Sequence, residues 1–201
     1  MAEDLQNLRI EYISANDIDL VIYSDADFGG DTDTNRSTSG YVTFYKGVLL
    51  SWRSKRQSKI STSTAISEFY ALNSAAKEAI YLKRIISEVT GKQCNAIVLG
   101  DNQSSLKQAE AARFSDKSKH VRIAASYIHE MVSNGELHLK YIPTTSNLAD
   151  LFTKGLERIV FTRLRDAIMN GRTSDILSEH ELTIRDNSSA NSLGGGGAAD
   201  E

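Results

Sequence analysis

Four acidic side chains stand where a sheet and its helices would bring them together: Asp25, Glu68, Asp101 and Asp150. Asp25 and Asp101 each follow a short run of apolar and β-branched residues that is typical of a strand. The carboxyl ends of neighbouring strands in an open sheet border one crevice, so we expect these two side chains to meet there. Glu68 lies on the margin of the apolar stripe of a long helix, and Asp150 lies near the start of a later helix.

Carboxylates that gather in one place repel each other, so a cluster of them is costly unless a cation neutralises the charge. Their hard oxygen atoms suit Mg²⁺ or Mn²⁺, and two such ions about 4 Å apart can hydrolyse a phosphodiester. Each acid taken singly also fits an ordinary structural role, in a turn after a strand or in the first turn of a helix. The spacing alone therefore leaves the metal site and the structural roles equally open.

Periodicity predicts five strands and several helices that would position these acids. The predicted strands span residues 19–23, 40–45, 48–52, 96–99 and 137–142. The predicted helices run from a hydroxyl-rich cap at 61–64 to Val89, and then over 103–112, 121–132, a short stretch from Asn147, and 157–169. Antiparallel strands come first and helix-separated strands follow, which indicates an α/β fold, a mixed sheet with helices on its faces.

The 201 residues have a globular composition, with 40% hydrophobic and 24% charged residues. We expect a domain over 18–171, an N-terminal extension over 1–17, and a C-terminal extension over 172–201 that is disordered from about residue 186. The single cysteine, Cys94, excludes an internal disulfide and a cysteine-based zinc site. Because the sequence has neither an apolar membrane span nor a secretory signal at its acidic start, we expect an intracellular protein, cytoplasmic or nuclear.

The formal net charge of -3 at first argues against a nucleic-acid binder, because such proteins are usually basic. The charge is unevenly distributed, however. Residues 1–35 contain nine acids and one base, and residues 155–201 contain eight acids and five bases. Residues 36–154 contain seventeen bases and nine acids, so a basic domain body lies between two acidic ends. This distribution permits modest, salt-sensitive binding of nucleic acid.

Six motifs, in order, resemble those of the ribonuclease H domain of Ty1/copia-type retrotransposon Pol polyproteins. They comprise residues 23–30 (YSDADFGG) with 36–42 (RSTSGYV), 50–57 (LSWRSKRQ), 63–72 (STAISEFYAL) with 75–79 (AAKEA), 101–105 (DNQSS), 119–121 (KHV) and 149–154 (ADLFTK). The resemblance covers roughly residues 18–171. Phe28 stands where this family usually has tryptophan, and Ile66 where it often has glutamate, but neither departure removes an acid of the cluster.

This resemblance implies a ribonuclease H-like fold with central strands ordered 3-2-1-4-5. It implies hydrolysis of the RNA strand of RNA–DNA hybrids with two Mg²⁺ (or Mn²⁺) ions. It places the family's metal-binding and catalytic acids on Asp25, Glu68, Asp101 and, as the fourth, Asp150. Such domains normally follow a reverse transcriptase domain, and only some twenty residues precede the first motif here. We therefore expect an excised domain, a truncated element or a domesticated copy, with a reverse transcriptase domain supplied elsewhere.

A cluster of positive charge before the long helix is a candidate substrate contact: Arg53, Lys55, Arg56 and Lys59. These cations would bind backbone phosphates of a hybrid, although edge strands also carry such residues simply as a solvated surface. Four polar residues beside the acids could donate to phosphates or to the 2′-hydroxyl of RNA: Ser63, Thr64, Asn102 and Gln103. The context of His120 indicates a catalytic proton shuttle or a phosphate contact near the metal ions.

Three functions therefore compete. The first is a metal-dependent ribonuclease H, which the presence of all four acids favours. The second is a non-catalytic nucleic-acid-binding module, domesticated or left by a decayed element. The third is a nuclease or integrase that acts on DNA with the same metal chemistry, and the set of motifs argues against it.

Overall fold

The structure is a computed structural model that describes residues 18–112 and 119–170. The predicted extensions over 1–17 and 172–201, including the predicted disordered tail, lie outside the described residues. The strands are β1 (Leu20–Asp27), β2 (Thr38–Tyr45), β3 (Val48–Arg56), β4 (Ala96–Gly100) and β5 (His138–Tyr141). The helices are α1 (Thr64–Thr90), α2 (Gln103–Glu110), α3 (Lys119–Ser133) and α4 (Arg158–Met169), with the short 3-10 helices η2 (Thr144–Ser146) and η3 (Leu148–Phe152).

The strands form one mixed sheet in the order β3-β2-β1-β4-β5. β1 pairs antiparallel with β2, and β2 antiparallel with β3, whereas β4 runs parallel to both β1 and β5. The predicted mixed sheet and the strand order that the resemblance implied are both confirmed. β3 continues to Arg56, beyond its predicted end at Trp52. The extra residues are polar and exposed, as is common on an edge strand, so they lack the apolar alternation that indicates a strand.

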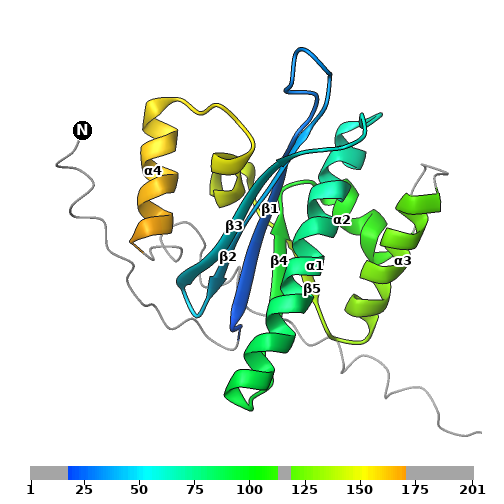
Figure 1. The fold of residues 1–201 in the computed structure, drawn as a ribbon, viewed down its shortest axis with the longest axis vertical. Coiled ribbons are helices and arrows are strands. Elements are labelled where there is room, and N and C mark those ends of the chain that lie inside the picture. The colour runs from blue at the N-terminus through cyan, green and yellow to red at the C-terminus, as the bar shows by residue number, and fades with distance from the viewer. Residues whose placement is uncertain (1–17, 113–118, 171–201) are drawn as a thin grey trace, which may run out of the picture.

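Helices cover both faces of the sheet (Figure 1). A separate apolar core lies on each side of it. α1, α2 and α3 pack on one face, in a core that includes Phe69, Leu72 and Ile128. η3 and α4 pack on the other face, in a core that includes Leu148 and Leu164. Side chains of β1 and β4 alternate between the two cores. The carboxyl ends of these two central strands are therefore supported from both sides.

The long helix α1 has a cap at each end. At its N-terminus the hydroxyl of Ser63 accepts a hydrogen bond from the backbone N–H of Ile66 (3.3 Å). At its C-terminus Gly91 adopts a left-handed conformation with φ 65°, and its N–H donates to the carbonyl of Ser87 (2.9 Å). The helix that the apolar spacing predicts is present, and its second turn carries Glu68.

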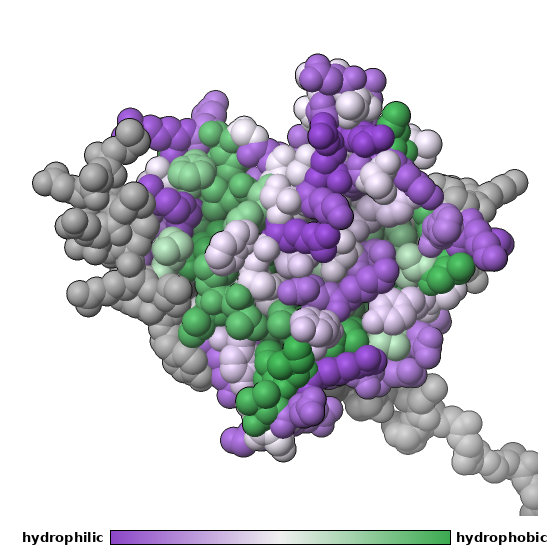
Figure 2. Space-filling view, in the orientation of Figure 1, coloured by the Kyte–Doolittle hydropathy of each residue, from purple (hydrophilic) through white to green (hydrophobic). Residues whose placement is uncertain are grey.

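The surface is polar around the carboxyl end of β1. Figure 2 shows hydrophilic residues gathered at the upper end of the molecule, where the loop after β1 projects in Figure 1. Apolar residues gather instead over the lower end of α1 and over the region of α4.

Two further observations concern membrane-spanning helices and the single cysteine. Within residues 18–112 and 119–170, no helix is both long enough and apolar enough to span a membrane. Cys94 is buried, and burial raises the pKa of its thiol to about 11. The thiol therefore stays protonated at neutral pH and is a poor nucleophile.

Candidate active site

The register between the two central parallel strands brings the first two acids together. β1 and β4 pair with Ser24 opposite Gly100, so Asp25 and Asp101 follow side by side at the carboxyl end of the sheet. The Asp25 side chain is fully buried, whereas Asp101 is partly exposed. This is the arrangement that the two strand ends predicted.

Glu68 completes a cluster of three carboxylates. One oxygen atom from each of Asp25, Glu68 and Asp101 lies within 4.8 Å of the other two. Among the Asp, Glu, His and Cys side chains of the described residues, these three carboxylates have the spacing of a metal site. Hard oxygen donors at this spacing suit Mg²⁺ or Mn²⁺, and their role as metal ligands stays a prediction.

The protonation of these acids reflects their burial and their mutual repulsion. Burial, followed by the charges of Asp25 and Asp101, raises the pKa of Glu68 to about 9. Burial also raises the pKa of Asp101, although a hydrogen bond from Thr144 opposes the shift. Burial and the charge of Asp25 raise the pKa of Asp150 to about 6. A divalent cation would offset these shifts, so the donor set fits a metal ion.

A lysine that sequence reasoning missed joins the fourth acid to the cluster. The Lys154 ammonium donates to Oδ1 of Asp25 (3.2 Å) and to Oδ1 of Asp150 (3.0 Å). The Thr153 hydroxyl donates to Oδ2 of Asp25, so both oxygens of that buried carboxylate are hydrogen-bonded. Burial lowers the pKa of Lys154, but the charges of Asp25 and Asp150 outweigh it and raise the pKa overall. Lys154 is therefore a charged bridge between two of the predicted acids.

Asn147 anchors the segment that carries these groups. Its amide nitrogen donates to the carbonyl of Ser24 (3.0 Å), the residue directly before Asp25. Its Oδ1 accepts a hydrogen bond from the N–H of Ala149 (3.1 Å) and so caps η3. Because Asn147 is fully buried, both bonds are shielded from water. The sequence indicated Asn147 as a helix start, but not its bond to β1.

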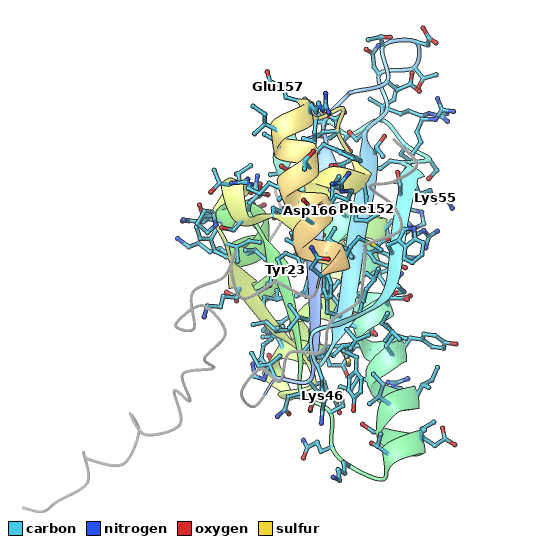
Figure 3. All side chains as sticks on the ribbon, turned by 90° about the vertical axis from the view of Figure 1, so that its left-hand side faces the viewer. Tyr23, Lys46, Lys55, Phe152, Glu157 and Asp166 are labelled. Atoms are coloured by element: carbon cyan, nitrogen blue, oxygen red, sulfur yellow. The ribbon has the colours of Figure 1, made fainter. Side chains whose placement is uncertain are left out.

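Gly40 allows η3 to approach the sheet. It lies opposite Asp25 in β2, and a Cβ atom there would lie 2.6 Å from Thr153 Cγ2 and 2.9 Å from Phe152 Cβ. Figure 3 shows Phe152 against the strands of the sheet. The lack of a side chain at Gly40 therefore sets the distance between Asp25 and the segment that carries Asp150.

A pocket of about 340 Å³ lies between β3 and α1, and we call it the basic pocket. All four predicted cations line it, and so does a predicted histidine: Arg53, Lys55, Arg56, Lys59 and His120. Figure 3 shows Lys55 on the outermost strand of the sheet. Both roles predicted for His120, the proton shuttle and the phosphate contact, stay predictions.

Two of the residues that line the basic pocket make further contacts within the protein. Arg56 forms an ion pair with Asp31 in the loop after β1, so this cation is partly neutralised within the protein. The buried side chain of Gln57 donates to Oγ of Ser39 (2.8 Å) and to the carbonyl of Ser67 (3.0 Å). Gln57 thereby ties the end of β3 to the helix that carries the third acid of the cluster.

The polar residues predicted beside the acids stand at two helix starts. Ser63 caps α1, and Asn102 caps α2 by accepting a hydrogen bond from the N–H of Ser105 (2.9 Å). Thr64 and Gln103 are exposed at the first positions of the same two helices. Contact with nucleic acid stays a prediction for all four.

Known proteins of similar sequence include several transposon polyproteins. The chain is 33% identical over 146 residues to the Retrovirus-related Pol polyprotein from transposon TNT 1-94 of Nicotiana tabacum, a match that covers 73% of this chain and 11% of that protein. It is 26% identical over 140 residues to the Transposon Ty1-ER2 Gag-Pol polyprotein of Saccharomyces cerevisiae, covering 68% of this chain and 8% of that protein. The chain thus spans about a tenth of the length of these relatives. No protein-family model matches it.

A solved structure of similar fold is that of LC11-RNase H1, a protein isolated from compost. It matches with a TM-score of 0.51 and 19% identity over 67% of this chain and 92% of that chain. At this identity the similarity concerns the fold alone, and it agrees with the strand order described above. The chain is therefore a homologue of one segment of the Ty1/copia-type retrotransposon Pol polyproteins, and it has a ribonuclease H-like fold.

Proposed function

We propose that this protein is a metal-dependent ribonuclease H that hydrolyses the RNA strand of RNA–DNA hybrids. The observation that carries the proposal is the convergence of Asp25, Glu68 and Asp101 at the carboxyl ends of two central strands. Acids so placed need a cation, and the raised pKa values of Glu68 and Asp101 support this need. Homology to Pol polyproteins supports a nucleic-acid substrate.

In this proposal Asp25, Glu68 and Asp101 hold the divalent ions, Mg²⁺ or Mn²⁺, with Asp150 as the fourth acid. Two bound ions would supply the activation of a water molecule and the stabilisation of the leaving oxygen. The protein's own contribution is to orient the donors: Thr153 and Lys154 fix both oxygens of Asp25. Burial of Asp25 in the central strand excludes water and strengthens these interactions.

The basic pocket would hold the hybrid by its backbone. Arg53, Lys55 and Lys59 present positive charge at the edge of the sheet, and phosphate contacts of this kind position a duplex without reading its bases. His120 would contribute a further phosphate contact. We therefore expect little base specificity. A reverse transcriptase domain that is supplied elsewhere in the cell would add further contacts to the hybrid.

The test of the proposal compares three labelled substrates: an RNA–DNA hybrid, an RNA duplex and a DNA duplex, each with Mg²⁺ or with EDTA. Cleavage of the RNA strand of the hybrid alone, abolished by EDTA, is the expected result. Hybrid binding without cleavage would instead support a non-catalytic module. Cleavage of the DNA duplex would support a nuclease of the same fold with another substrate, and would overturn the proposal.

Removal of charge from the basic pocket tests the substrate contact separately. Lys55→Gln is expected to weaken hybrid binding by on the order of 1 kcal/mol. It is also expected to lower the slope of log K against log salt by about one, because one phosphate contact is lost. Binding by fluorescence anisotropy at several salt concentrations measures both effects.

The matched control is Lys92→Gln, which removes the same charge from an exposed lysine just beyond the far end of α1. It is expected to leave the salt slope unchanged. Equal effects of the two substitutions would mean that Lys55 acts only through the overall charge, and the proposed phosphate contact would be wrong.

A further inference from the structure

Lys154 lies between two acids of the candidate metal site. Its ammonium nitrogen lies 3.2 Å from Oδ1 of Asp25 and 3.0 Å from Oδ1 of Asp150. The Asp25 side chain is completely buried, and that of Asp150 is 11% exposed. The lysine therefore neutralises negative charge at the point where the fourth acid meets the cluster.

Asp25 belongs to two groups at once. It is one of the three carboxylates with metal-site spacing, and it is also paired with Lys154. In the described part of the chain, Asp150 is not a member of that three-carboxylate group and instead meets Asp25 through the ammonium. The arrangement thus contains one group of carboxylates that suits a metal ion, and one adjacent position between Asp25 and Asp150 that already holds a positive charge.

An ammonium and a divalent ion cannot share that adjacent position. Mg²⁺ lies about 2.0–2.1 Å from its oxygen ligands, so an ion bound to the Oδ1 atoms of Asp25 and Asp150 from the side of the ammonium would lie too close to the lysine nitrogen. The two cations would also repel each other. The lysine has a flexible four-carbon stem and is 31% exposed, so its ammonium can move out to solvent.

We propose that Lys154 takes the place of one of the two cations of this site, and that it must swing out before a second divalent ion can bind between Asp25 and Asp150. This inference rests on the proposed function, because it assumes that the three carboxylates bind the first ion. Its consequence is that the two ions bind unequally. The first ion is held by Asp25, Glu68 and Asp101, and the second ion competes with the lysine for the position between Asp25 and Asp150.

Titration of the full chain with Mn²⁺, with free ion measured by electron paramagnetic resonance, tests this competition. The wild-type protein is expected to bind one ion tightly and a second at least tenfold more weakly. In Lys154→Met the competitor is gone, so the affinity for the second ion is expected to rise at least tenfold. Lys154→Arg retains the positive charge and is expected to keep the two affinities far apart. The matched control Lys77→Met removes an exposed lysine of α1 and is expected to behave as the wild type does.

A labelling experiment on the wild-type protein gives a second readout that does not depend on whether Lys154→Met folds. Acetylation of lysines, read by mass spectrometry, is expected to modify Lys154 slowly without metal. As Mg²⁺ rises through the range that fills the second site, modification of Lys154 is expected to increase several-fold, while that of Lys77 stays constant.

The outcomes separate this inference from the proposed function. A second ion that binds no more tightly to Lys154→Met, or Lys154 labelling that stays constant or falls with Mg²⁺, would overturn the inference while the metal site stands. A wild-type chain that binds no Mn²⁺ would overturn the metal dependence of the proposed function, and this inference with it.

Discussion

Replacement of Asp101 by asparagine is expected to abolish Mg²⁺-dependent cleavage of the hybrid and to leave the fold intact. Asp101 lies beside Asp25 at the end of the central strands and supplies one of the three clustered carboxylates. Loss of a group that merely supports a metal ligand already costs about 10- to 100-fold, so loss of a ligand is expected to cost more than about 100-fold. Rates of hybrid cleavage with saturating Mg²⁺ measure the effect.

Thermal unfolding of the same variant gives an independent check. Asp101 is one of the charges that raise the pKa of Glu68, so its removal relieves repulsion and is not expected to destabilise the metal-free protein. The rise in melting temperature on addition of Mg²⁺ is expected to shrink, because a metal that binds the folded state stabilises it. Asp33→Asn, in the exposed loop after β1, is the matched control and should behave as the wild type does. Full activity of Asp101→Asn would refute the metal site.

Substitution of Gly40 by alanine is expected to disturb the site from the neighbouring strand. The added Cβ would lie 2.6 Å from Thr153 Cγ2 and 2.9 Å from Phe152 Cβ, so η3 would have to move away from the sheet. Such overpacking costs roughly 1–3 kcal/mol of folding free energy. Because misplacement by about 1 Å can cost on the order of 100-fold in rate, we expect cleavage to fall by at least about tenfold.

The control for Gly40→Ala is Gly155→Ala, one residue after the lysine of the site. A Cβ at Gly155 meets no atom within 4 Å, so this variant is expected to keep both its stability and its activity. Chemical denaturation measures the free energy of unfolding, and cleavage of the hybrid measures the rate. If Gly40→Ala cleaves as fast as Gly155→Ala, the close approach of η3 is unimportant for the site.

The three clustered acids could be predicted because each has a local signal. Asp25 and Asp101 follow runs of apolar residues, and Glu68 lies on the margin of an apolar stripe, so the periodicity of each element places them. The sheet order is not a local property. It was predicted from the resemblance of whole motifs, since periodicity reveals strands but not which of them are neighbours.

The groups that orient Asp25 could not be predicted in this way. Thr153 and Lys154 follow a short 3-10 helix. From the sequence, a lysine at such a position is expected to be exposed to solvent. Their partner is more than 120 positions away in the sequence. Gly40 similarly reads as a residue of a strand, because the close approach that requires it comes from a distant segment. Each of these roles depends on tertiary contacts that leave no mark on local periodicity.

The separation between Asp25 and its partners has a consequence for the nascent chain. The bonds to Thr153 and Lys154 join residues 128 and 129 positions apart. A ribosome releases the N-terminal part of a domain first, so the three acids emerge well before the residues that hold Asp25 in place. Fragments that end before η3 would carry the carboxylates without their ammonium and hydroxyl partners. The hydrogen bonds that hold Asp25 can therefore form only after Lys154 has been translated.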